Sequence, residues 1–215
     1  GIHVLFGVNE DDIQYSLNDY LWGKCEIKQT AVDVTAALNG NPDNRLRIPA
    51  GGQIYLIPSS IKVGEIARVL REGYDVGLLN DGFQNLVTQL NLDILLIDTH
   101  PGLNEETLLS IAISDALAII MRPDQQDYQG TGVTVEVARK LDVPNMVLIV
   151  NKTPTSPDFN EVRERVAATY NCTVGAVLPH SDEMMTLASA GVFVLRYPDH
   201  PISQTLRRVA GLLLA

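Results

Sequence analysis

The sequence predicts an α/β fold, with a mostly parallel, twisted sheet and helices on both faces. Its 215 residues suit one domain with a substantial core, and 46% of them are apolar. In the second half of the chain, apolar runs of about five or six residues alternate with amphipathic segments of about ten to fifteen. Such alternation is typical of β-α-β units, whose parallel strands are covered by helices on both sides.

The first half of the chain is predicted to hold short elements and loops. Apolar residues at helical spacing predict a helix over residues 13–22, with Gly23 as its C-terminal glycine. Residues 39–52, rich in Asn, Pro and Gly, predict an exposed loop. We expect the remaining elements of this half to be a buried strand at 54–57 and helices at 61–73 and 83–90.

The second half is predicted to alternate strands and helices regularly. Strands are expected at 93–98, 116–121, 145–150 and 174–178, the first of them covered on both faces. The helices between them are predicted from caps and spacing: one capped by Asn104, one at 131–141, one opened by Ser156-Pro157, one at 182–190 between Ser181 and Gly191, and a last one burying Ile202, Leu206, Val209 and Leu213.

Composition excludes several classes of protein. The chain has 16 basic and 26 acidic side chains, and a formal net charge of −10 argues against a broad basic surface for nucleic acid. No run approaches the roughly 18 consecutive apolar residues of a membrane span. Cys25 and Cys172 are too few for a disulfide scaffold or a zinc site of their own, so we expect two reduced thiols.

Candidate functional residues follow the predicted strands, because parallel sheets bind ligands beyond the carboxyl ends of their strands. Residues 98–102, Asp-Thr-His-Pro-Gly, form a Walker B and switch pattern. In that interpretation Asp98 holds a Mg²⁺-bound water, and Gly102 leaves its amide free to approach a γ-phosphate. The alternative is an aspartate that ends a strand before an ordinary Pro-Gly turn.

Two further segments are candidates for a purine base site. Asn151 follows the strand at 145–150 and can offer a donor and an acceptor to a base edge. Residues 179–182, Pro-His-Ser-Asp, follow the strand at 174–178, and their backbone groups can line a base pocket. The plainer interpretations are a loop asparagine and a helix N-cap. Residues 122–127 are expected to form a solvated loop, with a partner-facing loop as the alternative.

Together these segments resemble the MinD/ParA family of deviant Walker P-loop ATPases, its MinD-like members in particular. The family's order and spacing are followed at residues 94–102, 114–123, 150–152 and 175–179, with Gly191 downstream. The chain departs from the family in one respect. The signature Lys-Gly-Gly-x-x-Gly-Lys-[Ser/Thr] is not among its residues, and Gly51-Gly52 lacks the lysine and leads into a predicted strand.

The resemblance therefore implies a P-loop NTPase-like fold that is incomplete. We expect residues 1–215 to be a single nucleotide-binding-type domain that is missing its N-terminal P-loop unit. One explanation is a fragment of a full ATPase that was cut upstream of Gly1. The alternative is a protein that lost its P-loop and serves as a binding module, a pseudo-ATPase.

For the whole protein the resemblance implies an ATP-dependent dimerisation switch with ATP and Mg²⁺ as cofactors. It assigns the catalytic residues to Asp98 and Gly102, with Asp98 the ligand of a Mg²⁺-bound water. It assigns nucleotide contacts to these residues: Pro101, Asn151, Pro179, His180, Ser181 and Asp182. His100 lies in the switch loop, either coupling to a partner or solvated. A metal-cluster carrier ranks below the switch because no Cys-x-x-Cys pair is present, and a biosynthetic ligase ranks below it because the sequence identifies no substrate pocket.

The expected partners are a second copy of the chain upon ATP binding, a regulatory protein, and a membrane or DNA cargo surface. The resemblance further implies spatial positioning or partitioning of cargo in a cytoplasmic protein, with peripheral membrane attachment as an alternative. The 215-residue chain alone is expected neither to hydrolyse ATP nor to bind it with micromolar affinity, since the phosphate contacts of the P-loop would be missing. It is also expected to be marginally stable, since strands that the P-loop unit would cover are left exposed.

Overall fold

The computed structural model describes residues 2–59, 73, 75–99, 102–156 and 158–215. It divides into two compact units. Unit 1 consists of Gly1–Leu96 and Leu187–Pro198, and unit 2 consists of Ile97–Thr186 and Asp199–Ala215. The single domain over residues 1–215 stays a prediction, and each unit is described by itself.

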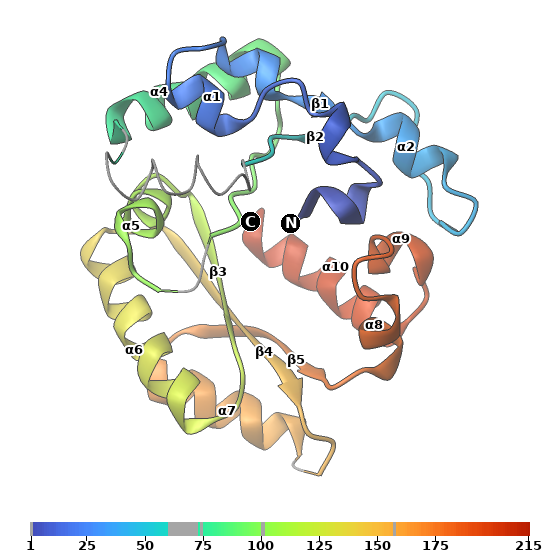
Figure 1. Ribbon diagram of the computed structural model, residues 1–215. Helices are drawn as coiled ribbons and strands as arrows, with labels where there is room; N and C mark the ends of the chain where they lie inside the picture. Colours follow the sequence, from blue (N-terminus) through green and yellow to red (C-terminus); the bar gives the residue numbers. More distant parts are fainter. Residues whose placement is uncertain (1, 60–72, 74, 100–101, 157) are drawn as a thin grey trace. The chain divides into compact units, whose positions relative to one another are not determined.

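Unit 2 is built on a parallel sheet of three strands in the order β3-β4-β5 (Figure 1). The strands are β3 (Ala116–Met121), β4 (Asn145–Thr153) and β5 (Thr173–Pro179). Met121 pairs with Val150, and Val150 pairs with Val177. The three strands therefore end at one edge of the sheet, and this alternation of parallel strands with helices confirms the predicted fold class.

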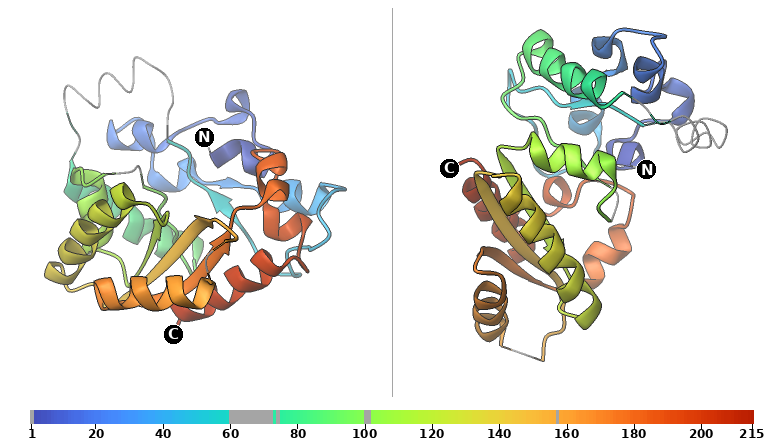
Figure 2. Two further views of the ribbon diagram at one scale, coloured as in Figure 1. Left: turned by 90° about the horizontal axis from the view of Figure 1, so that it is seen from below. Right: turned by 90° about the vertical axis from the view of Figure 1, so that its left-hand side faces the viewer.

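Helices cover both faces of this sheet (Figure 2). On one face, α6 (Gln125–Lys140) and α7 (Phe159–Tyr170) bury Val135, Val162 and Val166 against apolar strand residues. On the other face lies α10 (Pro201–Leu213), whose Val209 and Leu212 approach Gly175 of β5. Of the four residues predicted to be buried in the last helix, Ile202 and Val209 are 2% and 3% exposed, whereas Leu206 and Leu213 are only partly buried.

Side-chain caps explain where the helices of unit 2 begin. Asn104 accepts a hydrogen bond from the Thr107 backbone N–H (2.9 Å) and starts α5 (Glu105–Ala112), as predicted. Asp124 caps α6, so this helix begins six residues before the predicted start at residue 131. Asp158 caps α7, so the prediction that Ser156-Pro157 opens this helix is wrong. The Asp158 carboxylate accepts a hydrogen bond from the Asn160 backbone N–H (2.8 Å), one of the first-turn donors that have no partner within the helix.

Unit 1 has short elements and a two-stranded antiparallel sheet in which Val32 pairs with Leu56. Its core gathers Val34, Leu38 and Leu56. Tyr20 packs on α4 at Gly82, and its hydroxyl donates to the Leu78 carbonyl (3.0 Å). The elements are η1 (Ile2–Phe6), η2 (Glu10–Asp12), α1 (Leu17–Leu21), η3 (Ile27–Thr30), β1 (Val32–Asp33), α2 (Thr35–Gly40), β2 (Tyr55–Leu56), α4 (Val76–Leu90) and α9 (Phe193–Arg196).

The predicted strand at 93–98 does not form. These residues pair with no strand in the described part of the chain, and Ile94 and Leu96 are 50% and 87% exposed rather than covered. An apolar run becomes a strand only when neighbouring strands satisfy its backbone groups, and here local pattern alone was not enough.

Other predictions differ in length or lie outside the described residues. The helix predicted at 182–190 is α8 (Asp182–Leu187), which ends before Ala188 at φ +44°. The strand predicted at 54–57 shortens to β2, and the helix at 61–73 lies outside the described residues except for residue 73. None of the helices that the structure describes is both long enough and apolar enough to cross a bilayer.

Candidate functional site

A pocket of about 210 Å³ lies at the carboxyl ends of β4 and β5 in unit 2. It is lined by residues of the β4 end, the β5 end and the first turns of α8. These residues are Asn151, Lys152, Pro179, His180, Ser181, Met184 and Met185. Small-molecule sites usually occupy about 300–1,000 Å³, so this pocket suits a single ring system rather than a whole nucleotide.

The ends of the two strands hold the pocket together. Thr153 of β4 pairs with Pro179 of β5, and the His180 backbone N–H donates to the Thr153 carbonyl (3.0 Å). The Thr153 side chain is fully buried, and its hydroxyl has no hydrogen-bond partner in the described part of the chain. The His180 N–H is therefore not available to a ligand. Of the backbone groups of residues 179–182 that were predicted to line a base pocket, this donor is engaged within the sheet.

Ser181 has the structural role that its sequence position predicts. Its hydroxyl accepts a hydrogen bond from the Met184 backbone N–H (3.1 Å) and donates one to the Glu183 carboxylate (2.9 Å). The pKa of Glu183 is lowered, first by its own backbone N–H and then by the Ser181 hydroxyl. The serine thus fixes the start of α8 at the pocket rim, and its hydroxyl is already engaged.

Asn151 offers the pocket mainly a donor. Its Oδ1 accepts a hydrogen bond from the Lys152 backbone N–H (2.8 Å), at an irregularity of strand β4 where Lys152 adopts φ +54°. Its amide NH₂ donates no hydrogen bond within the described residues. The sequence predicted both a donor and an acceptor here, and the structure engages one lone pair of the acceptor locally.

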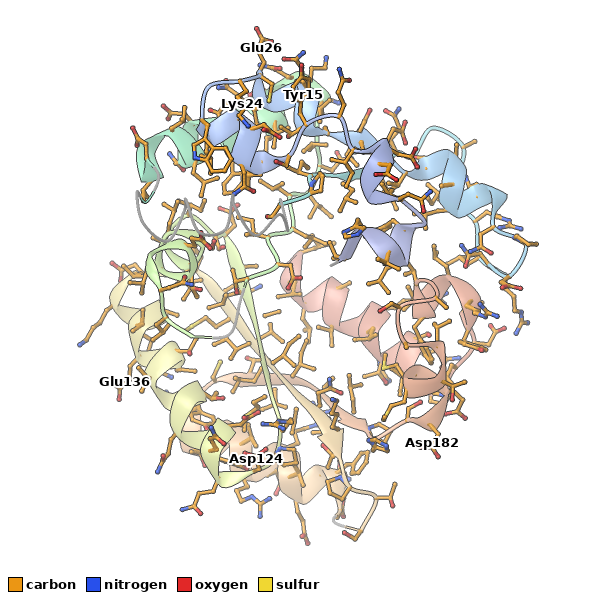
Figure 3. All side chains as sticks on the ribbon, in the orientation of Figure 1. Tyr15, Lys24, Glu26, Asp124, Glu136 and Asp182 are labelled. Carbon is orange, nitrogen blue, oxygen red and sulfur yellow. The ribbon has the colours of Figure 1, made fainter. Side chains whose placement is uncertain are left out.

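The structure brings four of the predicted site residues together in this pocket: Asn151, Pro179, His180 and Ser181. Asp182, labelled in Figure 3, does not line it, because its side chain is 96% exposed, with Oδ1 3.6 Å from His180 Nε2. Asp98 and Gly102 are exposed and do not line it either. Pro101 and His100 lie outside the described residues.

Sequence reasoning missed three residues that line the pocket, namely Lys152, Met184 and Met185. Lys152 follows Asn151 directly. The two methionines lie three and four residues after the Ser181 cap, on the helix face above it. Helical spacing from the predicted Ser181 cap would therefore have identified Met184 and Met185 from the sequence.

The described residues do not form a metal site by themselves. They contain no group of three or more His, Cys, Asp and Glu side chains that could hold a metal ion. Asp98 is an exposed single carboxylate there, which does not fit a resident Mg²⁺ site without other ligands.

Comparison with known proteins identifies two related sequences. No protein-family model matches the chain. It is 25% identical over 201 residues to an uncharacterized ATP-binding protein of Methanocaldococcus jannaschii, covering 93% of this chain and 67% of that protein. It is 24% identical over 165 residues to a second uncharacterized ATP-binding protein of the same organism, covering 74% of this chain and 58% of that protein.

Solved structures of two kinds share the fold. A MinD cell division protein of Aquifex aeolicus superposes with a TM-score of 0.71 at 18% identity, covering 97% of this chain and 80% of its own. A ParA family ATPase of Chlorobium tepidum superposes with a TM-score of 0.69 at 13% identity, covering 97% and 79%. A MinD cell division ATPase of Pyrococcus furiosus gives 0.69 at 15% identity, covering 97% and 78%. The chain therefore has the fold of the MinD and ParA ATPases.

Proposed function

We propose that this chain belongs to an ATPase of the MinD/ParA type and that the pocket at the ends of β4 and β5 receives the adenine base of ATP. The fold and the names of the two curated relatives as ATP-binding proteins support this proposal. The observation that carries it is the convergence of Asn151, Pro179 and His180 on one small pocket at the carboxyl edge of a parallel sheet.

The pocket's chemistry fits a purine ring. The amide NH₂ of Asn151, which donates to none of the described residues, can donate to a ring nitrogen, which is an acceptor. Met184 and Met185 add polarizable thioether surface, and the Met185 side chain is 60% exposed. Sulfur–aromatic contacts of this kind are worth about 0.3–1.5 kcal/mol, which suits weak recognition of a base whose phosphates are held elsewhere.

The phosphate side of the proposed site rests on Asp98, Pro101 and Gly102. We propose that Asp98 contacts a water bound to the Mg²⁺ of Mg-ATP and that the Gly102 amide approaches the γ-phosphate. Gly102 adopts φ +108°, and a Cβ added there would meet no atom of the described residues within 4 Å, so the backbone of Gly102 leaves room there for a close approach. Mg²⁺ would neutralise phosphate charge, and the remaining ligands would come from ATP and water.

At the level of the whole protein, we propose an ATP-dependent dimerisation switch that positions or partitions cellular cargo. One of the similar structures is a complex of MinD with MinC, which makes a regulatory protein partner a reasonable expectation for this chain. The homodimer, the membrane or DNA cargo surface and the cytoplasmic location belong to the same proposal. In the alternative, a binding module without nucleotide chemistry, the pocket would not recognise a base.

Titration of the ¹⁵N-labelled chain with adenosine tests the base site. Adenosine carries the base without phosphates, so binding is expected in the millimolar range and confined to the pocket. The expected shifts are those of the Asn151 side-chain amide and of the His180 and Ser181 backbone amides. Asn151→Ala should weaken this binding several-fold.

The matched control is Asn160→Ala, which removes an exposed asparagine amide on α7, outside the pocket lining. It should bind adenosine like the unmodified chain. Guanosine and uridine serve as base controls. If adenosine leaves the pocket signals unmoved at concentrations where the chain is folded, the base assignment fails and the binding-module alternative takes its place.

A further inference from the structure

Arg122 does not line the pocket, but it directly follows β3, the strand next to the one that carries Asn151. Strands β3 and β4 are parallel, with Met121 level with Val150. Met121–Val150 is the last pair of this ladder, so Arg122 and Asn151 are the residues that follow it, Asn151 at an irregularity of β4 between Val150 and Thr153. The segment that begins at Arg122 therefore borders the edge of the sheet on which Asn151 presents its amide.

Asp127 holds Arg122 at this place through three hydrogen bonds. The Arg122 backbone N–H donates to Asp127 Oδ2 (2.7 Å), Nε donates to the same oxygen (3.2 Å) and Nη2 donates to Oδ1 (3.0 Å). One carboxylate thus binds the backbone and both prongs of the guanidinium. This two-pronged geometry fixes orientation better than a single contact between charges.

Asp124 completes the arrangement. Its Oδ2 lies 3.3 Å from Arg122 Nε, and its Oδ1 accepts the Asp127 backbone N–H (3.0 Å). Figure 3 labels Asp124 where α6 begins. The sequence predicted a solvated loop at 122–127, whereas the structure forms a closed turn that joins the end of β3 to the first turn of α6.

The charges of the pair reinforce each other. The pKa of Asp127 is lowered, first by the hydrogen bond from the Arg122 side chain. The pKa of Arg122 is raised, first by the hydrogen bond to Asp127. Both groups are therefore charged at neutral pH, although the Arg122 side chain is 54% exposed and the Asp127 side chain 25%.

We propose that Arg122 and Asp127 are positioning residues for the base pocket: their ion pair fixes the sheet edge beside Asn151 and thereby sets the pocket's affinity for an adenine base. This inference rests on the proposed function. Neither side chain lines the pocket, so the pair acts through the backbone of the neighbouring strand end. An exposed pair transmits little free energy, so its effect on affinity is expected to be about three- to fivefold.

Adenosine titration of Asp127→Asn tests this inference, with Asp115→Asn as the matched control. Asp115 is exposed and immediately precedes β3, so the control makes the same charge change at the opposite end of the same strand. Asp127→Asn should raise the adenosine Kd about three- to fivefold. Asp115→Asn should leave it unchanged. The Asn151 side-chain amide signals should move in ligand-free Asp127→Asn and not in the control.

Two further variants separate positioning from general stability. Arg122→Lys keeps the charge and one contact, so it should retain more adenosine affinity than Arg122→Gln. If Asp127→Asn does not fold, Arg122→Gln takes its place in the test. If folded Asp127→Asn and Arg122→Gln bind adenosine with unchanged affinity and show unchanged Asn151 signals, this inference fails, while the proposed base site stands. Absence of adenosine binding by the unmodified chain would instead defeat the base assignment on which it rests.

Discussion

A Cβ atom added at Gly175 of β5 would lie 2.5 Å from Cγ1 of Val147 on the neighbouring strand β4. The same atom would meet Val209 and Leu212 of α10 at 3.4 Å. Glycine at this position therefore leaves room for the Val147 side chain of the neighbouring strand, whereas the contacts with α10 would be ordinary. Strand interiors usually disfavour glycine, so its presence here follows from packing rather than from a turn.

Gly175→Ala is expected to destabilise the chain by about 1–3 kcal/mol, because the added methyl group overpacks a buried contact between strands. Urea unfolding followed by circular dichroism measures this change. Gly132→Ala is the matched control, since Gly132 lies in helix α6 and its added Cβ would meet Tyr170 of α7 at an ordinary 3.7 Å. Alanine there should stabilise by about 0.5–1 kcal/mol. Equal effects of the two substitutions would contradict the packing argument.

Tyr170 should make the stability of the chain depend on alkaline pH. Burial raises its pKa from 10.0 to about 12, and its hydroxyl donates to the Tyr128 carbonyl (2.7 Å). Because the folded state favours the neutral phenol, the stabilisation is complete below pH 10 and is lost as pH rises towards 12. Tyr170→Phe should remove this loss, a difference on the order of 1 kcal/mol between pH 9 and pH 11.

Urea unfolding at several pH values checks this dependence. Tyr15→Phe removes a phenol from unit 1 and serves as the control for general alkaline effects (Figure 3). If the stability of Tyr170→Phe falls with pH as steeply as that of the unmodified chain, the buried phenol is not the cause.

Prediction from the sequence was most successful where the pattern is local. Strand β3 has the predicted bounds, and the caps Asn104 and Ser181 act as their positions predict. These features depend on a few neighbouring residues. The run at 93–98 has an equally apolar pattern but forms no strand, because a strand also needs a partner, which no local pattern supplies.

In the candidate site, too, the sequence predicted some features and missed others. Residues after β4 and β5 converge because parallel strands end at one edge, a topological rule that the sequence already allowed us to apply. The engagement of Asn151 Oδ1 by Lys152 and the turn from Arg122 to Asp127 depend on side-chain conformations. No spacing rule specifies these, so the predicted acceptor and the predicted loop both needed revision.

Lys152 adopts φ +54°, a left-handed conformation that β-branched residues strongly disfavour. Lys152→Val should therefore destabilise by about 1–2 kcal/mol. Lys152→Gly should be nearly neutral, because relief of the left-handed strain offsets the greater entropy of glycine in the unfolded chain. Thermal and urea unfolding of the pair measure the contrast, and equal stability of the two variants would mean that residue 152 is not held in this conformation.

The exposed side of β3 should make the chain prone to aggregation. β3 pairs only with β4 in the described part of the chain, and its sequence from Ala116 to Met121 has no charge and no proline. Ile120 is 64% exposed on this strand. An edge with free backbone groups and apolar side chains is a template for pairing with another chain, and an edge lysine blocks such pairing.

Ile120→Lys should thus raise the concentration at which the chain stays monomeric in light scattering, without loss of stability in urea. Val133→Lys is the matched control, because Val133 is 53% exposed but lies on helix α6 rather than on a strand edge. Both variants add one positive charge to a chain of net charge −10, so each reduces charge repulsion between copies equally. Greater solubility of Ile120→Lys alone would locate the cause at the edge of β3, whereas equal behaviour of the two would exclude it.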